Sequence, residues 1–185
     1  MENKVCFIGH REILVNDMES RIKQAVINEI KNGATCFMVG SHGMFDKLAL
    51  KVCKNLKTIY KNINIDLVIT SLAKLQNKND NKENFSDFNK DVNFVMFDIE
   101  QEYFKRQISI SNRKMIDCCS TLICYVDTRR SRSGAKSVLN YAIKKGLKII
   151  NLFCTQDDPT YNMTKQEKYE CFKTFIEKTD KILKK

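Results

Sequence analysis

Short apolar runs alternate with amphipathic stretches along most of the chain. The apolar runs are about four to eight residues long, which is typical of strands that are buried on both faces of a sheet. Strands are therefore expected over residues 4–9, 35–40, 63–70, 93–97, 121–126 and 148–153.

Between these runs, apolar residues recur every three or four positions, as they do on one face of a helix. The clearest case covers residues 16–32, and Gly33 follows it in the usual place of a C-terminal cap. Its inward face is expected to hold Met18, Ile22, Ala25, Val26 and Ile30. Further helices are expected over residues 44–56, 102–119, 133–145 and 165–184.

This order of strands and helices predicts an α/β fold, namely a Rossmann-like, doubly wound, mostly parallel sheet with helices on both faces. A chain of 185 residues suits a single domain over residues 1–185. Residues 75–91 are rich in Asn and Lys and lack periodicity. We expect them to form a loop or an irregular insertion within that domain.

No apolar run approaches the roughly 20 residues that a bilayer helix needs. The first run, at residues 5–8, is also far shorter than the hydrophobic region of a signal peptide. The eight cysteines form no CxxC pair, and several fall inside apolar runs, as expected of reduced, buried thiols. The spacing of Cys118, Cys119 and Cys124 matches no structural zinc pattern. We therefore expect a cytoplasmic protein without a metal ion or another cofactor.

The net charge of +10 arises from 32 Lys and Arg against 22 Asp and Glu. Most of these cations are lysines spread along the whole chain, which usually form a solvated surface. By contrast, Arg129, Arg130 and Arg132 crowd into the stretch before an expected helix. Guanidinium groups beside a helix N-terminus suit a small anionic ligand. The charge pattern therefore favours a small molecule over nucleic acid as the partner, and no membrane partner is expected.

Three loops of unusual composition follow expected strands, at the edge where open parallel sheets bind ligands. None of them contains a GxGxxG or P-loop motif. Their glycines would let the backbone approach a ligand, and free amides before a helix would face a phosphate. The candidate ligand-binding residues in these loops are Gly9, His10, Arg11, Gly40, Ser41, His42, Gly43, Asp46, Arg130, Arg132, Ser133, Gly134, Ala135 and Lys136.

Each loop also has a structural interpretation. Gly9, Gly40 and Gly134 would permit tight strand-to-helix turns in any protein of this class. His10 and His42 could make structural hydrogen bonds, and the arginines could form a solvated turn. Convergence of all three loops on one edge of one sheet is what favours a ligand.

Five segments together resemble the SLOG superfamily, the Rossmann-like group named for DprA/Smf and LOG ("lonely guy") proteins. Within it, they resemble the YpsA/YoqJ-like branch. The segments read VCFIGHR at 5–11, FMVGSHGMFDKLA at 37–49, SNRKMID at 111–117, LICYV at 122–126 and SRSGAKSVLNYA at 131–142. The resemblance implies a Rossmann-like sheet that binds nucleotides or nucleotide-derived signals such as ADP-ribose-type molecules.

Some members of the superfamily are enzymes that cleave the N-glycosidic bond of a nucleoside 5′-monophosphate. For these, the resemblance implies that an arginine matching Arg113 holds the substrate and that a glutamate follows a PGGxGT motif. The present loop has no proline and one glycine, Ala135 replaces the threonine, and Val138 lies at the glutamate position. A carboxylate there would stabilise an oxocarbenium-like centre or activate water, so the chain lacks a key group for that mechanism.

Two candidate residues have alternative interpretations. Arg113 could contact a phosphate, or it could pair with Asp117 at i,i+4 on the helix surface. Asp46 could accept a hydrogen bond from a ribose hydroxyl, or it could favour the first turn of its helix through the dipole.

Binding or sensing of a nucleotide-like ligand at the carboxyl ends of the strands is the leading hypothesis. The alternative is a nucleotide-processing enzyme, either a glycosidic-bond hydrolase or deoxyribosyltransferase-like, with Glu12, Asp46 or Glu102 as its carboxylate. A third hypothesis is DprA-like binding of single-stranded DNA, for which the chain lacks a basic stripe with interleaved aromatic residues. Homo-oligomers fit the resemblance, because relatives commonly pair through helices, but one sequence reveals no interface.

Overall fold

The computed structural model describes residues 3–13, 15–70, 91–99, 103–131, 133–158, 163–164, 166–167 and 169–170. Internal contacts divide the chain into two compact units, Met1–Phe153 and Cys154–Lys185, and each is described by itself. The second unit contains a short 3-10 helix, η1 (Thr155–Asp157), where Asp157 Oδ2 accepts the Cys154 amide at 2.9 Å. Most of the loop expected at 75–91 and of the helix expected at 165–184 lies outside the described residues. A single domain over residues 1–185 stays a prediction.

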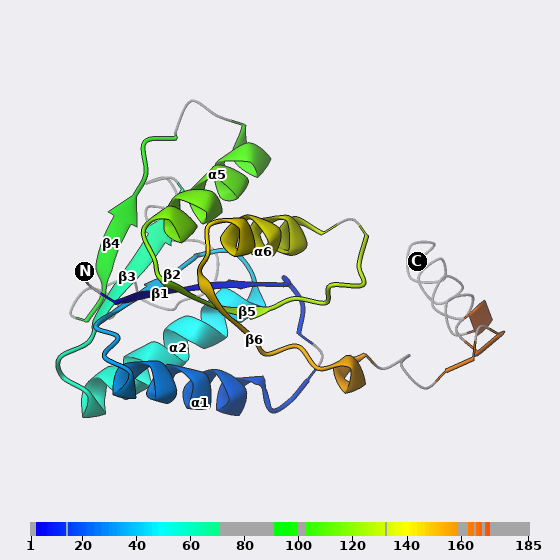
Figure 1. Ribbon diagram of the computed structural model, residues 1–185, viewed down its shortest axis with the longest axis horizontal. Helices are drawn as coiled ribbons and strands as arrows, with labels where there is room; N and C mark the ends of the chain where they lie inside the picture. The colour runs from blue at the N-terminus through cyan, green and yellow to red at the C-terminus, as the bar shows by residue number, and fades with distance from the viewer. Residues whose placement is uncertain are drawn as a thin grey trace, which may run out of the picture. The chain divides into compact units, whose positions relative to one another are not determined.

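The first unit is built on a six-stranded parallel sheet with the strand order β4-β3-β2-β1-β5-β6 (Figure 1). Each strand lies within a range expected from the apolar runs, and the predicted fold class is confirmed. The strands are β1 (Lys4–Gly9), β2 (Cys36–Val39), β3 (Asn64–Ile69), β4 (Asn93–Met96), β5 (Thr121–Tyr125) and β6 (Lys148–Asn151).

Helices cover both faces of this sheet (Figure 1). On one face lie α1 (Met18–Lys31) and α2 (Met44–Ile59), and on the other lie α5 (Phe104–Asp117) and α6 (Gly134–Lys144). The bounds of α1, α5 and α6 fall inside the expected ranges, whereas α2 continues to Ile59, beyond the predicted end at residue 56. Each described helix therefore packs one apolar side onto the sheet.

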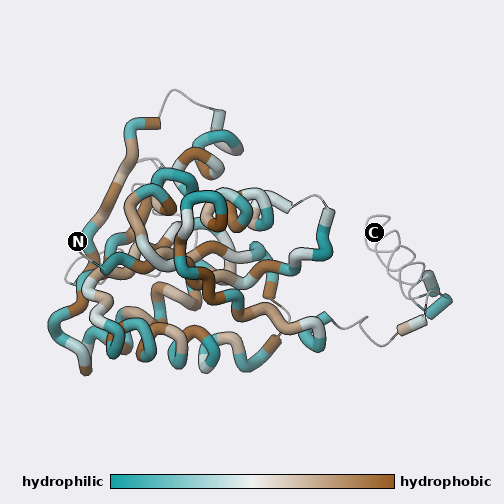
Figure 2. The backbone as a smooth tube through the Cα atoms, viewed as in Figure 1, coloured by the Kyte–Doolittle hydropathy of each residue, from teal (hydrophilic) through white to brown (hydrophobic). Residues whose placement is uncertain are grey.

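Strand β1 shows why the strand segments are apolar at every position and do not alternate between apolar and polar residues. Val5 and Phe7 belong to the core under α1 and α2, whereas Cys6 and Ile8 belong to the core under α5 and α6. All four side chains are buried. Because successive residues of a strand point to opposite faces, a strand covered twice needs apolar residues at every position. Figure 2 shows the resulting hydrophobic colouring along the strands and the mixed colouring of the helices.

One position of α1 was not expected to be buried. Ile30 is half-buried and packs against the core, as predicted, and its neighbour Glu29 is buried as well, with 2 % of its surface exposed. The Glu29 carboxylate accepts hydrogen bonds from Lys148 Nζ at 2.6 Å and from Thr121 Oγ1 at 3.4 Å. A buried ion pair with β6 therefore lies beside the apolar contact of Ile30 at this end of the helix.

The connections on the two sides of β1 run in opposite directions. The chain leaves β1 toward β2, β3 and β4, and it then returns through α5 to place β5 on the other side of β1. Five residue pairs, from Val5↔Thr121 to Gly9↔Tyr125, align β1 with β5. Beyond the carboxyl ends of these two strands the loops diverge, which is where doubly wound sheets bind ligands.

The described cysteines are free thiols. Cys6, Cys36, Cys53 and Cys124 are buried, as expected of small apolar side chains, while Cys118 is exposed. None of the described helices is both long and apolar enough to cross a membrane. Nor do three His, Cys, Asp or Glu side chains gather as metal ligands anywhere in the described part of the chain.

Candidate functional site

The three loops singled out in the sequence meet at the carboxyl ends of β1, β2 and β5. We call the described residues of 9–11, 40–43 and 127–134 the rim. Two backbone contacts join its parts: the Met44 amide donates to Arg11 O at 2.9 Å, and the His10 amide donates to Tyr125 O at 3.1 Å. The convergence expected from the sequence is therefore present in the fold.

His10 connects the loop after β1 to the loop after β5. Its ring is 8 % exposed, packs edge-on against Tyr125, and accepts the Asp127 amide on Nε2 at 2.9 Å. Because Nε2 is the acceptor, the ring proton lies on Nδ1. Burial, with a smaller effect from Arg130, lowers the His10 pKa. His10 is thus a neutral, structural histidine that keeps one N–H donor.

Gly43 makes the turn from β2 into α2. Its φ of +112° lies in the left-handed region, which side chains other than glycine rarely adopt. A Cβ at this position would also lie 3.2 Å from Arg11 Cα. The close approach of the first two loops therefore depends on a residue without a side chain.

Gly9 and Gly40 make room for protein atoms. A Cβ at Gly9 would overlap the buried ring of Phe45, and a Cβ at Gly40 would lie 2.8 Å from Asp46 Oδ2. The structure therefore supports packing of the first turn of α2 as the reason for these two glycines, which was the structural interpretation of each. At Gly134 a Cβ would meet nothing within 4 Å.

Asp46 lies in the first turn of α2 with its carboxyl buried. Burial raises the Asp46 pKa to about 7, and the hydrogen bond from the His42 amide to Oδ2, 2.8 Å long, opposes that rise. The ring of His42 in turn lies with Nε2 3.2 Å from Thr70 Oγ1, just after β3. Near neutral pH, this carboxyl is therefore able both to take up and to release a proton.

Ser41, between Gly40 and His42, has a buried hydroxyl. Among the described residues, Ser41 Oγ is the one buried side-chain polar atom without a hydrogen-bond partner. Folded proteins satisfy nearly all such groups, because an unpaired buried hydroxyl is destabilising. A ligand atom or a water molecule is the expected partner.

Asp127, buried at the end of β5, organises the arginine turn. Its carboxylate accepts Arg129 Nε at 2.9 Å and Arg129 Nη2 at 3.0 Å, while Arg130 Nε lies 3.8 Å away. These contacts, above all the hydrogen bond from Arg129, lower the Asp127 pKa. The Arg129 guanidinium also stacks over Phe153 at 5.5 Å from the ring centroid. Arg129 is thus fixed in the protein, and the exposed Arg130 is the more available cation.

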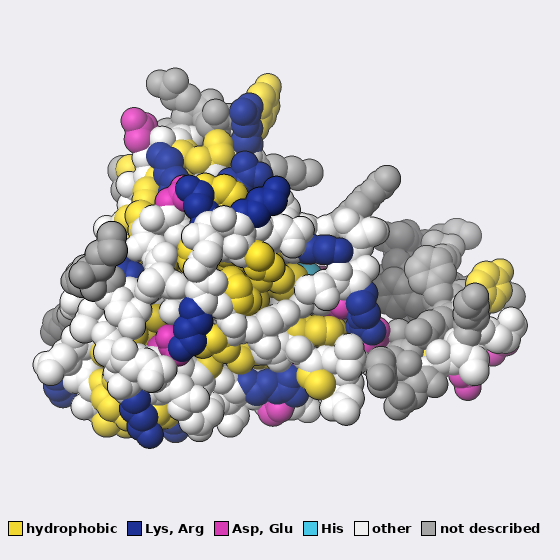
Figure 3. All heavy atoms as spheres, in the orientation of Figure 1, with side chains coloured by type: hydrophobic (Ala, Val, Ile, Leu, Met, Phe, Trp, Pro, Cys, Tyr) yellow, Lys and Arg dark blue, Asp and Glu magenta, His cyan; other side chains and the backbone are white. Residues whose placement is uncertain are grey.

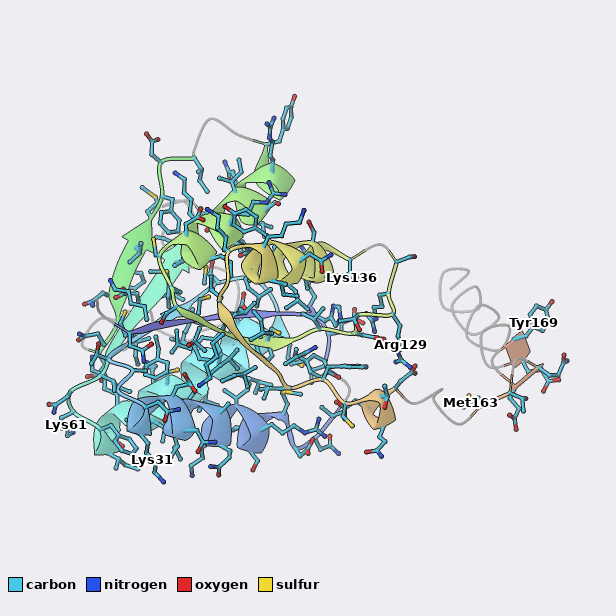
Figure 4. All side chains as sticks on the ribbon, in the orientation of Figure 1. Lys31, Lys61, Arg129, Lys136, Met163 and Tyr169 are labelled. Carbon is cyan, nitrogen blue, oxygen red and sulfur yellow. The ribbon has the colours of Figure 1, made fainter. Side chains whose placement is uncertain are left out.

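The α6 N-terminus completes the rim. Ser133 caps the helix by accepting the Lys136 amide at 3.2 Å, and Ala135 lies half-buried in the first turn. Arg132 lies outside the described residues, as does Glu102, and Glu12 is exposed. Figure 4 shows Arg129 and Lys136 toward the same end of the sheet, away from Lys31 and Lys61.

Arg113 and Lys136 lie beside the rim, in a groove of about 390 Å³ between α5 and α6. Of the two interpretations of Arg113, pairing with Asp117 is not what the structure shows. Asp117 instead binds Lys145 Nζ at 2.8 Å and the Tyr141 hydroxyl at 2.9 Å, and the Arg113 guanidinium lies over the Tyr141 ring at 5.5 Å. The residues that line this α5–α6 groove are Arg113, Ser131, Ser133, Lys136, Ser137, Asn140, Tyr141 and Lys144.

Two features of this region were missed by sequence reasoning. Asp127 follows an apolar strand directly, and that position could have marked it as a residue at the strand's carboxyl end. The α5–α6 groove arises from helix spacing, for which the sequence carries no comparable signal.

Together, the parallel sheet and the reversal of strand order at β1 and β5 define a doubly wound, Rossmann-like protein, whose rim carries Arg11, Arg129 and Arg130. The chain belongs to the YspA SLOG family, whose family profile (YpsA) matches residues 4–156. The matched stretch contains every candidate site residue, and the resemblance found in the sequence is confirmed. No match was found among curated proteins.

Proposed function

We propose that the protein binds a nucleotide-like anion at the rim. The observation that carries this proposal is the buried Ser41 hydroxyl, which has no hydrogen-bond partner. Hydrogen bonds join the turn around Ser41 to the loop after β1, and that loop to the loop after β5. A buried hydroxyl without a partner in the protein keeps its hydrogen-bonding capacity for a ligand atom, toward which a change of the Ser41 side-chain rotamer would turn it. Membership of the SLOG family supports a nucleotide-related role for this edge of the sheet.

The chemistry of the rim suits phosphate. Arg11 and Arg130 are exposed cations, His10 retains an Nδ1–H donor, and the N-terminus of α6 carries a partial positive charge. Asp127 does not cancel this charge, because it lies between two cations, Arg129 with two hydrogen bonds and Arg130 at 3.8 Å, which together leave one net positive charge. A guanidinium such as that of Arg130 binds phosphate through paired N–H donors.

A thermal-shift panel of nucleoside mono-, di- and triphosphates and ADP-ribose tests the proposal on the full chain. At about 100 times Kd, a ligand that binds only the folded state stabilises it by about 2.7 kcal/mol. For a protein of this size that corresponds to a rise in Tm of about 5–10 °C. If no nucleotide raises the midpoint, the proposal fails.

Point variants locate the site. Arg130→Gln should weaken the binding of the active nucleotide by roughly tenfold or more, because a charge-assisted hydrogen bond is lost. Ser41→Ala should weaken it by a smaller factor. Lys31→Gln removes the same charge at the other end of the sheet and should leave Kd unchanged. Equal effects of Arg130→Gln and Lys31→Gln would point to non-specific charge attraction.

A second candidate, catalysis on a nucleotide's glycosidic bond, is favoured by Asp46. Its buried carboxyl titrates near pH 7, which suits a general acid or base, and it lies close to Ser41 in the chain. Incubation with nucleoside monophosphates, followed by chromatography for free base, tests this activity. Base release that Asp46→Asn abolishes would establish it, and absence of release for every monophosphate would exclude these substrates.

A further inference from the structure

We propose that the ligand at the rim stacks a nucleobase on the flat guanidinium of Arg129, so that this residue selects nucleotides over sugar phosphates without a base. The inference rests on the proposed function of the rim, and it names the part of the ligand that phosphate-binding groups do not recognise. It concerns Arg129 and two aromatic residues, Tyr125 and Phe153, which lie at the carboxyl ends of β5 and β6.

The Arg129 side chain is fixed in position and in orientation. Its Nε and Nη2 donate to the two carboxylate oxygens of Asp127 at 2.9 Å and 3.0 Å, in the paired geometry that sets the plane of a guanidinium. The Arg129 amide also donates to Asp127, at 3.0 Å. Because this carboxylate already pairs with the guanidinium, Arg129 gains less from a phosphate than the exposed Arg130 does. Its flat surface is what it presents to a ligand.

Arg129 ends a series of aromatic rings that leads from the core to the rim. The rings of Phe45 and Tyr125 are buried and stacked, with centroids 6.3 Å apart and planes 20° apart. Tyr125 is followed by Phe153 at 5.5 Å, and the Arg129 guanidinium lies over the Phe153 ring at 5.5 Å from its centroid. Phe153 therefore covers one face of the guanidinium, and Asp127 contacts its edge.

The exposed part of Arg129 suits a planar aromatic group. Its side chain is 43 % exposed. Since Asp127 lies at the edge and Phe153 on one face, the exposed part includes the opposite face. Guanidinium planes stack on aromatic rings, and proteins that bind unpaired bases use arginine planes in this way. A nucleobase on this face would add one more ring to the series.

Arg130 is placed to contact the phosphate of the same ligand. It follows Arg129 in the chain, and its Nε lies 3.8 Å from Asp127 Oδ2. In a nucleoside monophosphate one ribose separates the base from the phosphate, so a single molecule can contact both arginines. Positive charge alone does not mark this place, because Lys and Arg side chains also gather over α5 (Figure 3). The distinguishing feature of the rim is a guanidinium held flat against a ring.

Isothermal titration of the full chain with AMP and with ribose 5-phosphate, at one pH and ionic strength, tests the inference. Both probes carry the same phosphate group, and only AMP carries a base. We expect AMP to bind at least about tenfold more tightly. Arg129→Lys keeps a cation beside Asp127 but removes the plane, so it should weaken AMP binding about fivefold or more and leave ribose 5-phosphate binding unchanged. Arg130→Gln should weaken the binding of both probes by the same factor.

A second pair of variants keeps Arg129 itself intact. Phe153→Leu removes the ring beneath the guanidinium and retains an apolar side chain, so it should weaken AMP binding about threefold or more and leave ribose 5-phosphate binding unchanged. Phe94→Leu is the matched control. Phe94 is likewise half-buried against the same core, but it lies on β4 at the opposite edge of the sheet. This control should leave the binding of both probes unchanged.

Equal affinities of native protein for AMP and ribose 5-phosphate would overturn the inference. Equal losses for both probes in Arg129→Lys, or equal effects of Phe153→Leu and Phe94→Leu, would do the same. Equal affinities that both fall in Arg130→Gln would still support an anion site at the rim. Absence of AMP binding would also overturn the inference, and the thermal-shift panel then decides separately whether the rim binds another nucleotide.

Discussion

Asp46 couples the stability of the fold to pH. Its pKa rises from 3.8 to about 7 on folding, mainly through burial, so the folded chain holds this proton more tightly than the unfolded chain does. The stability that Asp46 contributes is therefore greatest below about pH 4 and is lost as pH rises to about 7.

Asp46→Asn removes this ionisation and keeps an oxygen for the His42 amide. Relative to the native protein, the variant should gain on the order of 2 kcal/mol in unfolding free energy between about pH 5 and about pH 8. Urea denaturation at the two pH values measures the gain. Asp117→Asn is a control without pH dependence over this range: Lys145 lowers the pKa of Asp117 below its ordinary value of 3.8, so the stability from that residue is lost only as pH falls below about 4. A pH-independent difference for Asp46→Asn would contradict the expectation.

At His10, the side chain matters chiefly as a hydrogen-bond acceptor. His10→Leu leaves the buried Asp127 amide unpaired and should destabilise the protein by about 1–3 kcal/mol. His10→Gln can return an acceptor oxygen to that amide and should destabilise the protein clearly less than His10→Leu does. Denaturant unfolding distinguishes the variants, and equal stability of the two would mean that the bond to Asp127 contributes little.

Several residue roles were predictable only as alternatives. From the sequence, Gly9 and His10 are adjacent polar-loop residues that could meet a ligand or serve the fold. The structure shows the Phe45 ring beside Gly9 and the Asp127 amide on His10. Both partners come from distant parts of the chain, and nothing in the local composition encodes such long-range contacts.

At the scale of elements, the end of β1 packs against the first turn of α2 because Gly9 has no side chain and leaves room for the Phe45 ring. Gly9→Ala should destabilise the protein by about 1–3 kcal/mol, because the new Cβ overlaps the Phe45 ring. Phe45→Leu should lower the free energy of unfolding by less in the Gly9→Ala variant than in the native protein. A double-mutant cycle by denaturant unfolding should show a coupling of about 1 kcal/mol or more. Additive costs would mean that the two elements adjust independently.

The elements themselves were largely predictable. A strand covered on both faces, such as β5, must be apolar at every position, and helices such as α6 must carry one apolar face, so both leave clear patterns. Glu29 was missed because its partner Lys148 lies on another element, 119 residues away in the chain. The α5–α6 groove was missed for the same reason, since it depends on how two helices lie together.

At the scale of the whole molecule, both hydrophobic cores, as far as the structure describes the chain, consist of residues up to Phe153. A chain of residues 1–158 should therefore unfold in one cooperative thermal transition, measured by circular dichroism. A chain that ends at residue 147 lacks β6, with its contacts from Ile149, Ile150 and Lys148, and should lose that cooperativity. A non-cooperative transition for residues 1–158 would show that the second unit is needed for folding, as one domain over residues 1–185 implies.

The position of β5 also bears on how the protein is made. Cys6 and Thr121 are 115 residues apart, yet Cys6 Sγ lies 3.5 Å from Thr121 O. During translation, β1, β2 and β3 are synthesised well before β5, and the edge of β1 that pairs with β5 stays unpaired until then. A nascent chain at this stage can misassociate through that edge. The junction of β1 and β5 can close only after residue 125 has been made, so a ligand that binds there is captured only from that stage of synthesis onward.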